Sequence, residues 1–175
     1  MIDRRLHYAS RLGRNPSRLR LMGTPVALVM LGSMATAIPV IAQSPVLPPF
    51  GLILLLVWRL LRPELWRAWH ALPLGLFDDM MSGQPIGSAM CLWTLILIAV
   101  DFMEHRLIWR DWRQDWLIAS VAIIIYVLAS AFFVHITGGG AIRPALMIPQ
   151  MLWSVLLFPF IVRQCARIDR WRLMA

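Results

Sequence analysis

Long apolar segments alternate with short polar segments along almost the whole chain. After an arginine-rich start, the apolar segments are residues 21–42, 48–61, 71–81, 86–102, 116–136 and 144–162. Four of them reach or approach the ~20 residues that an α-helix needs to cross the hydrocarbon core of a bilayer. The third has only 11 residues, so we expect a short helix there or a re-entrant hairpin with the fourth. The pattern predicts an all-α, polytopic membrane protein with about six transmembrane helices.

The first apolar segment allows two interpretations. It ends in "VIAQS", where Val40 and Ala42 have the small-residue spacing of a signal-peptidase site. The segment is longer than a usual signal sequence, however, and no soluble domain follows it, so we favour an uncleaved first helix. The expected organisation is an arginine-rich cytoplasmic segment at 1–20, one transmembrane helical domain at 21–163, and a basic cytoplasmic tail at 164–175.

Charge fixes the expected orientation. The 175 residues are 59% hydrophobic and 15% charged, whereas globular chains have about 25% charged residues. The net charge is +8, and all 17 basic residues are arginine. If both termini lie in the cytoplasm and the chain crosses six times, 16 of the 17 arginines are cytoplasmic, as the positive-inside rule requires. The basic excess therefore indicates membrane orientation and not nucleic-acid binding.

One polar stretch between the fourth and fifth apolar segments, "RLIWRDWRQDW", is rich in tryptophan and arginine. Its tryptophans recur every three or four residues on one helical face, and its arginines lie on another: Trp109, Trp112 and Trp116 against Arg106, Arg110 and Arg113. One interpretation is an interfacial helix that lies among lipid headgroups. The other is a docking surface for a cytoplasmic partner, and the two are compatible.

The sequence offers little for catalysis. There is no H-E-x-x-H or C-x-x-C motif, the four histidines are scattered, and no serine has a nearby His–Asp arrangement. The adjacent carboxyl groups of Asp78 and Asp79 diverge by about 100° on a helix, so they cannot easily share a proton as in an aspartyl protease. We therefore expect no enzyme activity, no metal site and no cofactor.

An acidic residue within a membrane segment usually has a partner. Asp79 lies one helical turn before Gly83, near the predicted periplasmic end of its segment. The one arginine predicted on that side is Arg143, so we expect Asp79, or alternatively Asp78, to pair with it. Asp101, near the cytoplasmic end of the fourth segment, is expected to pair with Arg59 or Arg106.

The stretch "GLFDDMMSGQPIG" resembles the signature of the rod shape-determining MreD family, G-L-x-x-D-x-x-x-G-x-P-[LI]-G. The matching positions are Gly75, Leu76, Asp79, Gly83, Pro85, Ile86 and Gly87. Upstream, "PPFGLILLLVW" followed by "RP" resembles the family's proline-led second helix. The sequence departs from the family at Asp78, where an uncharged residue is usual, so the motif favours Asp79 as the working carboxylate.

The resemblance implies a fold similar to the six-helix substrate-binding subunits of vitamin transporters. It also implies a non-enzymatic scaffold of the cell-elongation machinery in the bacterial inner membrane. The implied partners are MreC, MreB, RodA and a class B penicillin-binding transpeptidase, besides membrane lipids. The alternative function is a vitamin-type transporter subunit with a polar pocket lined by Asp79, Gln84, Ser88 and Arg143. An intramembrane enzyme is a third, weaker reading.

Overall fold

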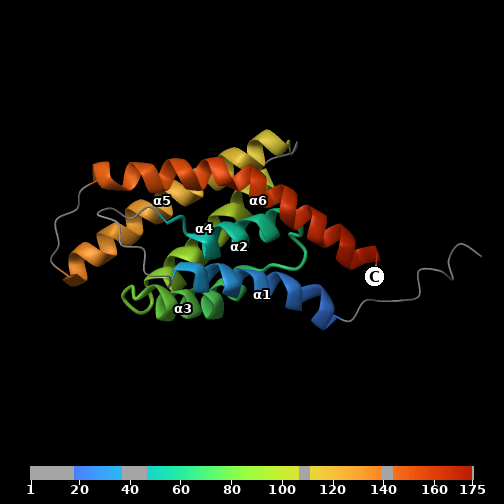
Figure 1. The fold of residues 1–175 in the computed structure, drawn as a ribbon, viewed down its shortest axis with the longest axis horizontal. Helices are drawn as coiled ribbons and strands as arrows, with labels where there is room; N and C mark the ends of the chain where they lie inside the picture. The colour runs from blue at the N-terminus through green and yellow to red at the C-terminus, as the bar shows by residue number, and fades with distance from the viewer. Residues whose placement is uncertain (1–17, 37–46, 107–110, 139–143, 175) are drawn as a thin grey trace, which may run out of the picture.

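A computed structural model describes residues 18–36, 47–106, 111–138 and 144–174 (Figure 1). Every regular element in these ranges is helical. The α-helices are α1 (Arg18–Thr36), α2 (Phe50–Leu61), α3 (Ala71–Ser82), α4 (Ser88–Arg106), α5 (Trp112–Gly138) and α6 (Ile148–Met174). Short 3-10 turns, η2 (Ala68–His70) and η3 (Pro144–Met147), precede α3 and α6. The predicted all-α class and the helix order agree with this structure.

The helices form a layered bundle. In Figure 1, α2 and α4 lie between the α1–α3 pair and the α5–α6 pair, and contacts join α3 to α4, α1 to α2 and α5 to α6. The first residues of α1 and α5 and the last residues of α6 lie toward one end of the molecule, at the right of Figure 1. The turn between α3 and α4 lies toward the opposite end. The bundle therefore has an arginine-rich end and an end formed by the α3–α4 turn.

Proline and glycine determine where the short helices begin and end. α2 starts directly after Pro49, whose carbonyl accepts the first helical hydrogen bond, from the Ile53 N–H at 3.0 Å. α2 stops at Arg62, because the ring of Pro63 disfavours helical geometry in the residue before it. α3 stops at Gly83, which has the left-handed φ of 67° that is common just after a helix.

α2 is the centre of the hydrophobic core. Six of its side chains have no exposed surface: Leu52, Ile53, Leu55, Leu56, Val57 and Trp58. Trp66, in the loop after α2, is also buried at 4% exposed. Both tryptophan rings are therefore enclosed by the bundle and do not face lipid headgroups. Trp69, Trp112 and Trp171 are more than half exposed.

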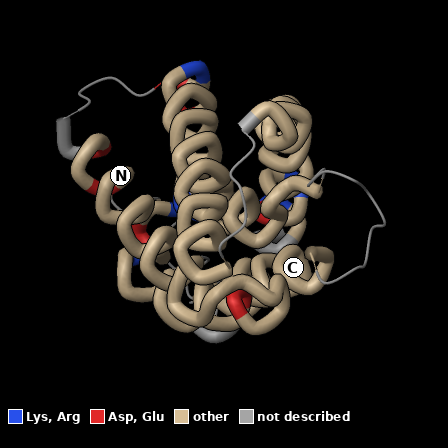
Figure 2. Tube along the Cα trace, turned by 90° about the vertical axis from the view of Figure 1, so that its left-hand side faces the viewer, with Lys and Arg blue, Asp and Glu red and all other residues tan. Residues whose placement is uncertain are grey.

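The outer helices expose broad apolar faces. Large side chains on α5 and α6 that are more than half exposed include Leu117, Phe132, Leu152, Leu156 and Phe160. Among the described residues, two helical segments, Trp112–Gly138 and Ala145–Trp171, are long and apolar enough to cross a membrane. Most of the trace in Figure 2 carries no charge. Long helices with so many exposed apolar side chains are typical of a protein that contacts lipid.

Two helices are much shorter than a bilayer is thick. α3 has 12 residues, as expected for the short third segment, and α2 has the same length. At 1.5 Å per residue each measures about 18 Å, against the ~30 Å of the hydrocarbon core. The second apolar segment, 48–61, is itself only 14 residues long, so the short α2 agrees with the sequence.

α6 runs through the segment that was assigned to the C-terminal tail. It contains Pro159, which lacks a backbone donor, and it bends partway along its length in Figure 1. Beyond the bend, Cys165 and Asp169 face the bundle, whereas Arg163, Arg167 and Arg170 are exposed. The basic tail is therefore a continuation of a transmembrane-length helix, packed at the end of the bundle.

Candidate functional site

The turn between α3 and α4 is built on two glycines. Gly83 has a φ of 67° and Gly87 has a φ of 97°, a region that side chains other than glycine rarely adopt. Between them, Pro85 accepts a 3.0 Å hydrogen bond from the N–H of Ser88, the first residue of α4. These residues reverse the chain in five positions, so α3 and α4 pack directly against each other.

Asp79 binds the start of α4. Its Oδ1 accepts hydrogen bonds from the N–H of Ala89 at 2.8 Å and the hydroxyl of Ser88 at 3.0 Å. Its Oδ2 accepts hydrogen bonds from the N–H of Gly87 at 2.8 Å and, more weakly, from that of Met90 at 3.3 Å. An ionised carboxylate has about four acceptor positions, and the turn supplies four donors.

This arrangement gives a buried charge a favourable environment. Asp79 is only 1% exposed, and a helix N-terminus combines free N–H groups with the positive end of the helix dipole. Asp79 therefore acts as the N-terminal cap of α4, although it belongs to α3. The expected pairing with Arg143 lies outside the described residues, whereas both oxygens of Asp79 already have partners here.

Gly75 lets the two helices touch. A Cβ atom built on Gly75 would lie 2.6 Å from Cα and 2.7 Å from the backbone nitrogen of Met90. Because these are backbone atoms of α4, they cannot move aside as a side chain would. The first glycine of the motif and its aspartate thus perform one task together: Gly75 sets the helix separation at which Asp79 reaches the α4 N-terminus.

Asp78 lies in a different environment, in the middle of the bundle. It is 4% exposed, and the hydroxyl groups of Ser33 on α1 and Tyr126 on α5 lie beside it. Gly51 on α2 makes room, since a Cβ there would lie 3.0 Å from Asp78 Oδ1 and 2.9 Å from the Trp93 ring. The residue that departs from the family signature therefore sits where side chains of α1, α3, α4 and α5 meet the backbone of α2.

In the part of the chain that the structure describes, no ion pair joins a cation to the polar cluster of Ser33, Asp78, Trp93 and Tyr126. The described residues contain no group of three His, Cys, Asp or Glu side chains that could hold a metal ion. Ser33 Oγ and Trp93 Nε1 are buried without a hydrogen-bond partner. The cluster places hydroxyl and indole groups around one carboxyl group and so brings several helices together at one point.

The opposite end of the bundle is held by ion pairs from α2. The buried guanidinium of Arg59 contacts Asp101 at 2.5 Å and Glu104 at 2.6 Å, both on α4. Arg62 contacts Asp169 on α6 at 2.9 Å. The predicted Arg59–Asp101 pair is confirmed, whereas Glu104 and the Arg62–Asp169 pair were missed. Asp101 and Glu104 are three residues apart on one helical face, a spacing that could have indicated a shared partner.

The tryptophan–arginine stretch is only partly described. Trp109 and Arg110 lie outside the described residues, as do Val40 and Ala42 of the possible signal-peptidase site. Trp112 and Trp116 form the first turns of α5, and Trp112 is 55% exposed. The indole N–H of Trp116 donates to the carbonyl of Val155 at 3.3 Å, which joins α5 to α6.

The fold and the α3–α4 turn together define a helical membrane protein in which Asp79 of the motif holds α3 and α4 together. A family model described as "rod shape-determining protein MreD" matches residues 18–167, which is most of the chain. The chain belongs to the MreD family, whose role is in determining rod shape. No curated protein and no solved structure matches it significantly.

Proposed function

We propose that this chain is a non-enzymatic membrane scaffold of the bacterial cell-elongation machinery and acts with MreC. Family membership supports the role in rod shape. The observation that carries the scaffold role is the environment of Asp79, whose two oxygens are both hydrogen-bonded to the start of α4. The acid of the motif is thereby committed to architecture and is not free to act on a substrate.

Partners would meet the scaffold on two kinds of surface. The exposed apolar faces of α5 and α6 suit transmembrane helices of MreC, RodA or a class B penicillin-binding transpeptidase. The arginine-rich end suits a cytoplasmic partner such as MreB. There, Arg163, Arg167 and Arg170 are exposed along α6 without a carboxylate partner among the described residues.

The proposed topology has six crossings of the inner membrane, with both termini in the cytoplasm. It is supported by the arrangement of helix ends in Figure 1 and by the concentration of arginines at one end. α2 and α3 are too short to span a flat bilayer alone, so flanking residues or local thinning would complete their crossings.

The proposed fold resembles that of vitamin-transporter substrate-binding subunits, but no observation favours transport. Asp79 and Ser88, which would line the polar pocket, are buried and bonded to each other.

The test is depletion and complementation in a rod-shaped bacterium whose own family member is repressed. The wild-type chain and Glu64→Gln, a change in an exposed loop residue, are expected to restore rods. Asp79→Ala is expected to leave cells round and swollen, because α4 loses its cap, and to reduce copurification of MreC. Rods without any complementing chain, or a nutrient requirement with normal shape, would contradict the proposal.

A further inference from the structure

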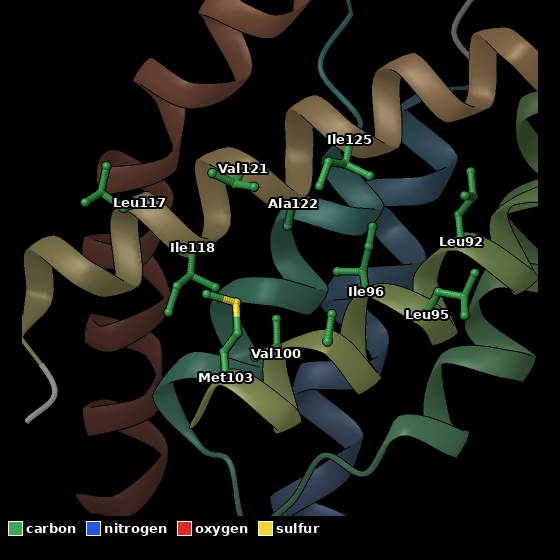
Figure 3. A pocket seen from close by; sticks show the side chains of 11 residues that line it. Leu92, Leu95, Ile96, Val100, Met103, Leu117, Ile118, Val121, Ala122 and Ile125 are labelled. Atoms are coloured by element: carbon green, nitrogen blue, oxygen red, sulfur yellow. The ribbon is translucent and has the colours of Figure 1, made fainter. Parts of the chain in front are cut away.

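An apolar groove runs between α4 and α5. Its volume is about 370 Å³, within the usual range of roughly 300–1,000 Å³ for ligand sites. Side chains of the two helices face each other across it, among them Ile96 and Met103 on α4 and Ile118 and Val121 on α5 (Figure 3). All of its lining side chains are apolar, so its occupant there must be hydrocarbon-like.

The groove extends over about one leaflet. On α4 it runs from Leu92 to Met103, and on α5 from Leu117 to Ile125. At 1.5 Å per residue these stretches measure about 16 Å and about 12 Å. Half of the ~30 Å hydrocarbon core is about 15 Å. A transmembrane helix would need a groove about twice as long, whereas an acyl chain of one leaflet matches this length.

A positive charge stands at one end of the groove. Arg113 precedes Leu117 by four residues and Val121 by eight, so it continues the groove-lining face of α5 by one turn. Arg113 is exposed, and no described carboxylate lies within ion-pair distance of it. The carboxylates at this end of α4, Asp101 and Glu104, already contact Arg59.

We propose that the groove holds an acyl chain of an anionic phospholipid whose phosphate binds Arg113. A guanidinium recognises phosphate through charge and several N–H donors. Trp112, exposed beside Arg113, would lie at the headgroup level, where indoles are favoured. In the proposed topology this is the cytoplasmic leaflet, which carries anionic lipid. The inference goes beyond the scaffold role and does not depend on any protein partner.

The headgroup contact can be tested with the purified full-length chain in detergent, titrated with phosphatidylglycerol and followed by native mass spectrometry. One tightly bound phosphatidylglycerol is expected, with phosphatidylcholine bound more weakly. Arg113→Gln is expected to weaken binding about fivefold, the effect of one basic residue near anionic lipid. The matched control Arg167→Gln removes an exposed arginine on α6 and is expected to leave binding unchanged. Equal effects of the two variants would overturn the proposal.

The acyl-chain contact needs its own pair of variants. Val121→Trp fills the groove, whereas Leu128→Trp introduces the same indole side chain on the exposed face of α5 outside it. Both positions are about half exposed, so both proteins are expected to fold. Only Val121→Trp is expected to lower phosphatidylglycerol binding. If Val121→Trp leaves lipid binding unchanged but releases MreC, the groove binds a protein helix and the proposal is wrong.

Discussion

The neighbouring residues Asp78 and Asp79 lie in different environments, which place different demands on their carboxyl groups. Asp79 points at the end of a helix and accepts four hydrogen bonds, three of them from backbone N–H groups. Asp78, about 100° further round α3, points into the bundle beside Ser33 and Tyr126. Asp79 needs its negative charge to bind the helix N-terminus. Asp78 lies beside hydroxyl groups, with which an uncharged amide could form hydrogen bonds equally well.

Asp79→Asn is therefore expected to destabilise the protein by about 2 kcal/mol or more, since it replaces charge-assisted hydrogen bonds and points an amide at N–H groups. Asp78→Asn is expected to change stability by less than about 1 kcal/mol, because the amide retains the shape and can bond hydroxyl groups. Thermal unfolding in detergent, followed by the fluorescence of the nine tryptophans, measures both. Equal losses would show that the two acids do not differ in this way.

At the scale of the helices, glycine controls how closely the elements approach. Gly75 brings α3 against the α4 backbone, and Gly51 brings α2 against Trp93 and Asp78. Gly32 does the same for α1, where a Cβ would lie 3.1 Å from the Phe50 carbonyl. Small residues at such contacts are typical of membrane helices, whose packing depends on van der Waals contact and not on exclusion of water.

Gly75→Ala is expected to cost about 1–3 kcal/mol, because its Cβ would overlap backbone that has no room to move. The matched control is Gly23→Ala in α1, where a Cβ meets nothing within 4 Å. That change is expected to stabilise by up to about 1 kcal/mol through helix propensity. Unfolding of the two variants under the same detergent conditions checks the contrast. A harmless Gly75→Ala would mean that α3 and α4 are not in backbone contact.

At the scale of the whole molecule, the proposed topology places the loop before α3 inside the cell and the turn after it outside. Single cysteines at Glu64 and Gln84, in a chain whose Cys91 and Cys165 are replaced by alanine, test this in intact cells. A membrane-impermeant maleimide is expected to label Gln84→Cys and to leave Glu64→Cys unlabelled until the cells are opened. The reverse labelling would invert the orientation.

The sequence predicts the outline of the molecule better than its contacts. Hydropathy and turn residues were enough to predict the helix order and the α3–α4 turn at Gly83 and Gly87. They could not show that α2 is enclosed, because core-facing and lipid-facing side chains are equally apolar. Charge counting paired Asp79 with Arg143, which lies outside the described residues. It did not anticipate the backbone N–H groups that Asp79 binds, because such a search considers only oppositely charged side chains.

The capping of α4 by Asp79 has a consequence for biosynthesis. A carboxylate that leaves water for hydrocarbon without a partner costs several kcal/mol, and α3 alone gives Asp79 none of its four donors. The donors arrive only when the first turn of α4 has formed. We therefore expect α3 to wait in the translocon until α4 emerges from the ribosome, and the two to pass into the lipid together as a hairpin.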